Sequence, residues 1–184
     1  LQMIPSKLNY YFEKLLAATR VRPIIGGMEI SNSTIRLAYF DGRMWRLGGV
    51  RLLPGVFEDG KIKDRGHLIE ALKSAKLQVF GKKYDKRRVN VVASLSSVNI
   101  YSQVFRLPII KGESLDKAIE LNIQMVTPLD SSQAYSGWQI VGEDKRTLQL
   151  GILAAFIDRS LVDELSKALL DAEFLLIALE SRAL

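Results

Sequence analysis

The chain contains no cysteine and only one histidine, His67. Disulfide bonds and thiolate metal sites are therefore excluded, and a single imidazole cannot form a cluster of histidine ligands. No apolar run approaches the about 20 residues that a membrane-spanning helix needs. Lys7, Glu13 and Lys14 interrupt the apolar residues near the N-terminus, so no signal peptide is indicated and the cytosol is the expected compartment.

The residues that usually mark an enzyme are also scarce. No glycine-rich loop followed by lysine and serine is present, and no serine has a histidine placed to activate it. Asp158, Asp163 and Glu164 lie near an expected helix start, where acidic side chains usually complement the helix dipole. We therefore expect no independent catalytic site in this chain.

Positive charge, in contrast, is abundant. The 184 residues carry a formal net charge of +6, which favours an acidic partner such as an anionic membrane surface or an acidic protein. A basic run like that at residues 82–88 is usually a solvated connection before a strand, and the alternative is a contact with anionic lipid or an acidic partner. Nucleic acid is disfavoured, because only Tyr84 interleaves this run and no recognised nucleic-acid module surrounds it.

Residues 1–21 form a leader with an amphipathic pattern. The spacing of its apolar residues among charged ones predicts a helix over residues 5–20. The apolar residues are Tyr10, Tyr11, Phe12, Leu15 and Leu16. Either this helix packs on its own domain, or it docks on a membrane surface or a partner.

The rest of the chain alternates between strand and helix patterns, which predicts an α+β fold with a mixed sheet. Asp41-Gly42 is a strong hairpin turn signal, and Asp64 is a candidate N-cap for the first helix. The other two expected helices cover residues 115–126 and 160–172. The expected strands are residues 22–30, 33–40, 43–53, 88–95, 98–107, 134–141, 147–156 and 174–179. Of these, 88–95 and 98–107 are expected to pair with each other.

Several short passages carry a family resemblance. The segment from Gly27 to Arg36 is similar to the phosphate hairpin Gly-Leu-Asp-Ile-Gly-Ser-Ser-Ser-Ile-Lys that opens actin-like nucleotide domains. Four other passages carry the resemblance. The first is residues 53–62, which contain Leu-Pro, Gly-Val and Asp-Gly-Lys-Ile, and the second is residues 91–98, an expected strand, turn and start of a strand. The last two are Arg106-Leu107-Pro108 and Glu180-Ser181-Arg182-Ala183-Leu184. In this order and spacing, over residues 26–184, they resemble the PilM family, the actin-like proteins of type IV pilus assembly.

The resemblance implies an actin-like, ribonuclease H-like mixed sheet with helices and an inserted module. Residues 22–87 and 142–184 would form the actin-like subdomain. Residues 88–141 would form a strand–helix–strand–strand module, which PilM shares with the cell-division protein FtsA. The match covers the first half of the family's fold, since the second phosphate hairpin would lie beyond Leu184.

The same resemblance locates a phosphate hairpin that departs from the family pattern. Glu29 stands where the pattern has Asp, and Ser31 stands where it has Gly, whose missing Cβ permits close approach to the backbone. We therefore expect a degenerate hairpin, no enzymatic activity and no cofactor in this chain, with ATP and magnesium bound only if a second half exists. The hairpin residues are Gly27, Glu29, Ser31, Asn32, Ser33 and Thr34.

The family's role is scaffolding, which the resemblance extends to this chain as an expectation. PilM lies on the cytoplasmic face of the inner membrane and captures the short cytoplasmic peptide of the membrane protein PilN, near other proteins of the pilus platform. We expect a cytoplasmic scaffold, peripheral at the inner membrane, of a type IV pilus or a related type II secretion system. The alternatives are half of an actin-like ATPase and a membrane adaptor similar to FtsA or GspL.

The partner peptide is expected beside the module, because strand edges readily accept another chain. Asn122 interrupts an otherwise apolar helix face and is expected to satisfy the backbone of a peptide. For each apolar candidate, the alternative is that it fills the module's own core. The candidate contacts are Val98, Ile100, Gln103, Ile119 and Asn122.

Overall fold

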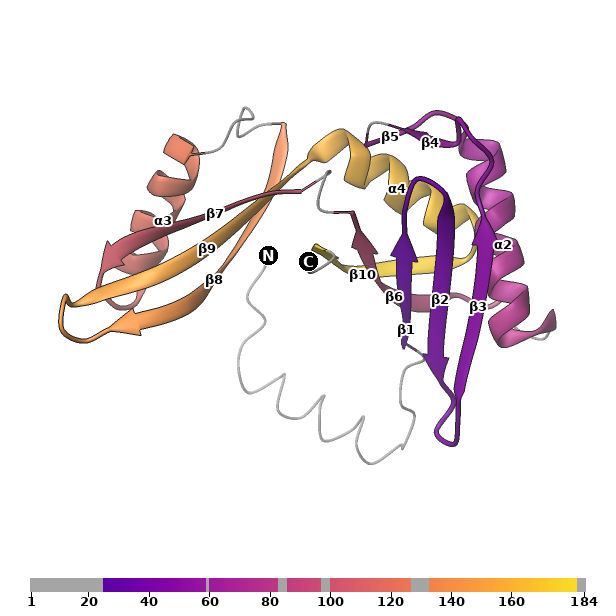
Figure 1. Ribbon diagram of the computed structural model, residues 1–184, viewed down its shortest axis with the longest axis horizontal. Coiled ribbons are helices and arrows are strands. Elements are labelled where there is room, and N and C mark those ends of the chain that lie inside the picture. Colours follow the sequence, from indigo (N-terminus) through magenta and orange to yellow (C-terminus); the bar gives the residue numbers. More distant parts are fainter. Residues whose placement is uncertain (1–24, 59, 83–85, 97–99, 127–132, 182–184) are drawn as a thin grey trace.

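The structure is a computed structural model that describes residues 25–58, 60–82, 86–96, 100–126 and 133–181. The predicted leader and Val98 lie outside the described residues. A five-stranded sheet and a three-stranded sheet form two lobes, which Figure 1 shows side by side. Within the described ranges, every helix falls short of the length or the apolarity that a membrane crossing requires.

The larger lobe is built on a mixed five-stranded sheet. β1 (Ile25–Ile30), β2 (Thr34–Phe40) and β3 (Trp45–Arg51) form an antiparallel meander, as the turn signals predicted. β6 (Val89–Leu95) runs parallel to β1, and β10 (Phe174–Ser181) runs parallel to β6. The strand order is therefore β10-β6-β1-β2-β3.

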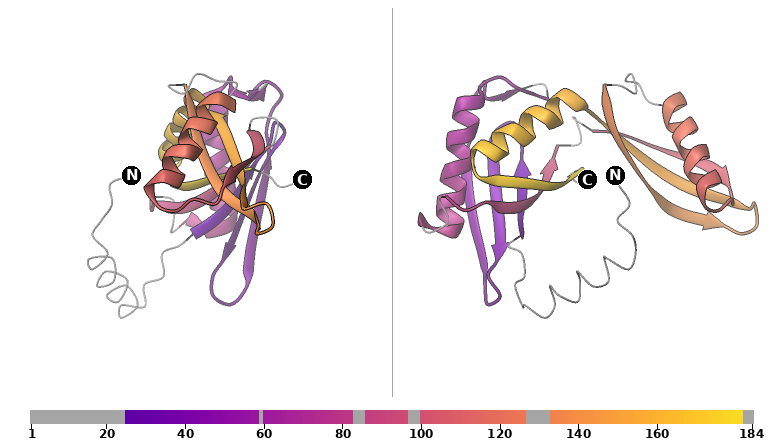
Figure 2. Two further views of the ribbon diagram at one scale, coloured as in Figure 1. Left: turned by 90° about the vertical axis from the view of Figure 1, so that its left-hand side faces the viewer. Right: turned by 180° about the vertical axis from the view of Figure 1, so that it is seen from behind.

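Two helices cover one face of this sheet and leave the other face open. α2 (Arg65–Phe80) and α4 (Arg159–Asp171) lie behind the sheet in Figure 1 and in front of it in the right-hand view of Figure 2. Their buried side chains form one core with alternate residues of β1, β2 and β6. An ion pair of 2.6 Å between Arg65 Nη2 and Asp171 Oδ2 joins the start of α2 to the end of α4.

Asp64 begins α2 as predicted. Its carboxylate accepts a hydrogen bond of 3.0 Å from the backbone N–H of His67, and its other oxygen lies 2.7 Å from His67 Nδ1. The N–H and the ring of His67 lower the pKa of Asp64, and the Asp64 carboxylate raises the pKa of His67. Before this cap, β4 (Phe57–Glu58) and β5 (Lys61–Ile62) pair as a short antiparallel ribbon that the sequence did not predict.

The smaller lobe is a strand–helix–strand–strand module. β7 (Tyr101–Pro108), β8 (Ala134–Asp144) and β9 (Gln149–Asp158) form an antiparallel sheet in the order β7-β9-β8. α3 (Glu113–Val126) packs on one face of it. The buried core between them consists of Leu107, Ile119, Leu150 and Ile152. The α+β class with a mixed sheet and an inserted module is confirmed.

The expected strand pairing at the module is wrong. Residues 88–95 and 98–107 do not pair, because β6 lies between β1 and β10 while β7 pairs with β9. Alternate residues of β6 from Val89 to Leu95 are buried in the core of the larger lobe, which holds this strand in the larger sheet. The module sheet therefore spans residues 101–158 rather than 88–141, and β9 leads directly into α4.

Candidate functional site

The turn between β1 and β2, the expected phosphate hairpin, is closed by its own side chains. The backbone N–H of Ser31 donates to the Thr34 carbonyl oxygen at 2.9 Å, and the Ser31 hydroxyl oxygen accepts from the Thr34 N–H at 3.0 Å. The hydroxyl oxygens of the two residues lie 2.9 Å apart. Asn32 and Ser33 are exposed between them. The Ser31 side chain is thus bonded within the turn, at the position where the family pattern has glycine.

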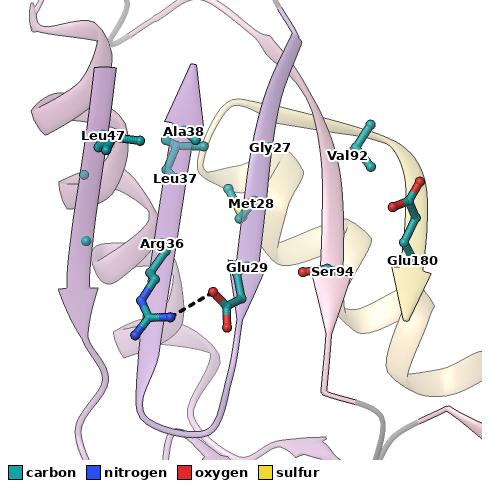
Figure 3. A pocket seen from close by; sticks show the side chains of 12 residues that line it. Gly27, Met28, Glu29, Arg36, Leu37, Ala38, Leu47, Val92, Ser94 and Glu180 are labelled. Carbon is teal, nitrogen blue, oxygen red and sulfur yellow. Dashed lines mark hydrogen bonds and ion pairs between the residues drawn. The ribbon is translucent and has the colours of Figure 1, made fainter. Parts of the chain in front are cut away.

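Glu29 forms an ion pair on the open face of the sheet. Its Oε2 lies 3.0 Å from Nη1 of Arg36, which faces it from β2 (Figure 3). Gly27 lies one step along the same face of β1 (Figure 3). In the part of the chain that the structure describes, no group of three or more His, Cys, Asp or Glu side chains could hold a metal ion.

A second site lies between the two lobes. It is a groove of about 440 Å³ whose walls come from β8 and β9 of the module and from α4 and β10 of the larger lobe. Most of its lining side chains are apolar. Leu150 and Ile152 of β9 pack against α3, whereas Ala155, Phe156 and Ile157 at the end of the same strand line the groove. We call this site the interlobe groove.

Two strand edges border the interlobe groove. Among the described strands, β10 pairs only with β6 and β8 pairs only with β9, so each is an edge strand. The register of β10 shifts between Leu176 and Ala178, which leaves Ile177 as the extra residue of a bulge. Ile177 is 47% exposed and lines the groove. Bulges commonly redirect a side chain beside a binding site.

Hydrogen bonds and a ring contact clamp the two lobes at one end of the groove. The Tyr135 hydroxyl donates to Asp163 Oδ1 at 3.0 Å, and the Arg159 guanidinium lies 4.2 Å from the centre of the Tyr135 ring. The Arg159 backbone N–H donates to the Gln133 carbonyl oxygen at 2.8 Å. These contacts tie β8 to the first turn of α4 and so set the spacing of the groove walls.

The N-cap of α4 lies at this same junction. The Asp158 carboxylate accepts from the hydroxyl of Ser160 at 2.6 Å and from the N–H groups of Ser160 and Leu161 at 2.7 and 3.4 Å. The Ser160 hydroxyl contributes most to lowering the pKa of Asp158. Asp158 therefore has the helix-start role that the sequence predicted for it.

The structure does not bring the predicted peptide contacts together. Ile100 lines the interlobe groove and packs partly against the larger core. Gln103 is exposed on β7 and does not line the groove. Ile119 is fully buried between α3 and the module sheet, so its expected contact with a partner is wrong. The Asn122 amide donates to the Ala118 carbonyl oxygen at 2.8 Å within α3, and Asn122 does not line the groove.

The sequence missed the residues of β10 and β8 that line the groove. Both segments were predicted as strands. The alternation of apolar and polar residues along a strand does not indicate whether that strand lies at the edge of its sheet. The only local signal is the unbroken apolar run from Phe174 to Leu179, which a strand with one polar face would not have.

Comparison with known proteins identifies the fold. No known protein family and no curated protein matches the sequence. Among solved structures, a chain of the "PilM-PilN type IV pilus biogenesis complex" aligns with a TM-score of 0.71 and 18% identity over 88% of this chain. The cytoplasmic domain of EpsL, an inner membrane component of the type II secretion system of Vibrio cholerae, aligns with a TM-score of 0.50 and 10% identity over 85% of this chain.

This chain spans 48% of that PilM–PilN chain and 56% of the EpsL domain, so it corresponds to about half of each. At these identities the likeness shows the fold, because the same fold carries unrelated functions in different proteins. The chain has a PilM-like, actin-like fold.

Proposed function

We propose that this chain is a scaffold component of a type IV pilus or a related type II secretion system. It binds the short cytoplasmic peptide of a PilN-like membrane partner in the interlobe groove. In this role the chain lies in the cytoplasm at the inner membrane, beside other proteins of the assembly platform. The solved structures with the same fold support the proposal, since one is a PilM–PilN complex and the other belongs to an inner-membrane component.

The observation that carries the proposal is the pair of edge strands at an apolar groove. An extended peptide can add to an exposed sheet edge, where main-chain hydrogen bonds supply affinity and pockets for alternate side chains supply specificity. β10 and β8 both offer such an edge, and Ile177 is turned out of the regular pairing into the groove. The Tyr135–Asp163 hydrogen bond joins the two walls of the groove and fixes their spacing at that end.

The phosphate hairpin supports a binding role over an enzymatic one. Phosphoryl transfer depends on backbone groups that cradle the phosphates and on a carboxylate that positions the metal. Here the Ser31 side chain is bonded within the turn, and the Glu29 carboxylate is paired with Arg36 at 3.0 Å. We therefore propose that this half of the fold is retained as a platform and not as a catalyst.

The test is a titration of the full chain into a fluorescein-labelled peptide that reproduces the cytoplasmic N-terminus of a PilN-like protein. Fluorescence anisotropy reports the affinity. Ile177→Asp places a charge in the groove and is expected to weaken binding about tenfold or more, which corresponds to about 1.4 kcal/mol. Ile177 is part-exposed, so the folded state tolerates the change.

The matched control is Val104→Asp. Val104 is also an apolar residue on a strand, 59% exposed, and it does not line the groove. The affinity of this variant is expected to equal that of the parent chain. Equal loss in both variants, or no loss in Ile177→Asp, would contradict the groove as the peptide site. Absence of peptide binding together with ATP turnover would favour the ATPase alternative.

A further inference from the structure

The tip of the β2–β3 hairpin exposes apolar side chains. The chain turns at Asp41, whose backbone N–H donates to the Met44 carbonyl oxygen at 3.2 Å. Figure 1 and the right-hand view of Figure 2 show this tip projecting beyond the other strands and helices of the larger lobe. Met44 is 59% exposed and Trp45 is 66% exposed, and the centre of the Trp45 ring lies 5.4 Å from that of Phe40. The tip can therefore reach a surface that the rest of the lobe does not touch.

Two arginines flank these apolar residues. Arg43 comes immediately before Met44 and Arg46 immediately after Trp45, and both arginines are exposed. Asp41 Oδ2 accepts from Arg46 Nε at 2.8 Å, which holds that guanidinium at the tip. None of the ion pairs among the described residues involves Arg43. The tip therefore combines apolar side chains with a net positive charge.

A hollow of about 750 Å³ opens between the tip and the C-terminal end of α2. Arg43 and Arg46 line it from the hairpin, and Phe80 lines it from α2. The Phe80 ring lies 4.9 Å from that of Tyr39, which joins the helix end to the hairpin. Asp41 is the one carboxylate among the described lining residues. Two guanidinium groups beside one carboxylate suit an anion such as a phosphate group, which arginine binds well.

More positive charge lies at the same end of the sheet. Tyr39, near the end of β2, pairs with Gly26, which in turn pairs with Val91 of β6. β6 therefore begins at the end of the sheet where the hairpin turns. Glu173 offsets one positive charge there, because its Oε2 lies 3.6 Å from Arg88 Nε. The exposed basic residues are Lys82, which follows α2, and Lys86, Arg87 and Arg88, which precede β6.

This combination favours a lipid bilayer over other acidic partners. Tryptophan concentrates at membrane interfaces, where the ring is partly apolar and its N–H stays hydrated. A membrane surface with anionic lipid has a negative potential that attracts basic segments. A nucleic acid or an acidic protein segment would pair with the arginines, but it offers no apolar layer for Met44.

We propose that the β2–β3 tip docks on the headgroup layer of a bilayer that contains anionic phospholipid. The two apolar side chains enter that layer, and the two arginines contact lipid phosphates. The basic residues beside β6 add attraction at longer range. This surface shares no lining residue with the interlobe groove. The proposal therefore adds a direct membrane contact to the proposed function without depending on the peptide site.

The test is sedimentation of the full chain with vesicles of phosphatidylglycerol and phosphatidylcholine in equal parts, compared with vesicles of phosphatidylcholine alone. Binding is expected only to the anionic vesicles and is expected to weaken as salt is added, because salt screens the charges. Trp138→Phe leaves Trp45 as the only tryptophan, and its emission is expected to shift to shorter wavelength on binding. No peptide is present, so failure here and failure of the peptide titration are separate results.

Matched pairs of variants test the two kinds of contact. Arg43→Glu is expected to weaken vesicle binding about tenfold or more, whereas Arg51→Glu, the same change at the opposite end of β3, is expected to weaken it far less. Met44→Asp is expected to weaken binding severalfold, and Met125→Asp, at an 83% exposed position of α3, is expected to leave it unchanged. All four side chains are exposed, so the fold is expected to tolerate the changes, and circular dichroism checks this.

Three results would overturn the proposal. Equal binding to vesicles with and without phosphatidylglycerol, or an unchanged Trp45 emission on the anionic vesicles, would show that the tip does not enter a charged headgroup layer. Equal loss in Arg43→Glu and Arg51→Glu would show that binding follows the overall charge and not the tip. Binding to polyglutamate that Arg43→Glu weakens and Met44→Asp does not, without binding to vesicles, would assign the surface to an acidic protein segment.

Discussion

Two adjacent glycines of β3 offer a direct test of which face of the sheet is covered. Gly48 faces α2, where an added Cβ would lie 2.7 Å from Val79 Cγ2 and 3.2 Å from Gln78 Cβ. Val79 is buried, and 2.7 Å is shorter than any ordinary contact between two carbon atoms, so Val79 or the backbone of β3 must shift. Gly49 faces the open side, where an added Cβ would meet only the Ile35 carbonyl oxygen at 3.7 Å, an ordinary contact. Gly48→Ala and Gly49→Ala are therefore the same chemical change on opposite faces.

The expected difference follows from that geometry. Both substitutions remove backbone freedom from the unfolded chain, which stabilises the folded state by about 0.4–1 kcal/mol in each case. This contribution cancels when the two variants are compared. What remains is the overpacking against α2, which costs about 1–3 kcal/mol. For a chain of this size the two melting temperatures should then lie roughly 2–12 °C apart, with Gly48→Ala the lower.

Urea denaturation followed by circular dichroism measures the difference in unfolding free energy between the two variants, when that free energy falls with urea concentration at the same slope in both. A slope shared by the parent and both variants would show that the denatured states are comparable. Equal unfolding midpoints for the two variants would refute the assignment of Gly48 to the helix side. That result would also remove the basis for an open face at Trp45 and Leu47, because β3 would be rotated by one residue.

Two further predictions concern the turns. The chain is expected to release no phosphate from ATP in the presence of magnesium, because Ser31 is bonded within its turn and Glu29 is paired with Arg36. ATP turnover that disappears in Glu29→Ala would contradict this prediction. Asp41 accepts hydrogen bonds from the N–H groups of Met44 and Arg43 and from the Arg46 side chain, and these lower its pKa from 3.8 to about 2. The stability that the ionised Asp41 gives to the β2–β3 turn is therefore complete above pH 3.8 and is lost as the pH falls towards 2. A carboxyl NMR titration of the folded chain measures this pKa. A titration of Asp41 near 3.8 would contradict the geometry.

Local sequence signals predicted the elements well where the chemistry is local. Asp64 begins α2 because its carboxylate reaches the N–H of His67 three residues away. Asp41-Gly42 predicted the β2–β3 hairpin, since Gly42 takes a positive φ of 94° that other residues avoid. The apolar residues of 88–95 predicted a strand, and β6 is that strand, with Val91 and Ala93 buried. Each of these depends on residues within a few positions of one another.

The tertiary structure decided which sheet each strand joins. β6 and β7 follow each other in the chain and both were expected as strands, yet β6 pairs in parallel with β1 and β10 while β7 pairs with β9. Period-two alternation indicates which side chains are buried, and it does not indicate the neighbouring strand. The expected module boundaries at residues 88 and 141 were wrong for that reason.

The candidate site depends even more on long-range contacts. Ile119 and Ile177 are both isoleucines in apolar stretches, but Ile119 of α3 is buried against the module sheet, and Ile177 is directed by a bulge into the interlobe groove. The sequence determined the mixed sheet, the helix starts, the hairpin turns and the resemblance of Gly27 to Arg36 to a phosphate hairpin. Only the packing of one lobe against the other produced the groove, because its walls come from segments that no local pattern relates.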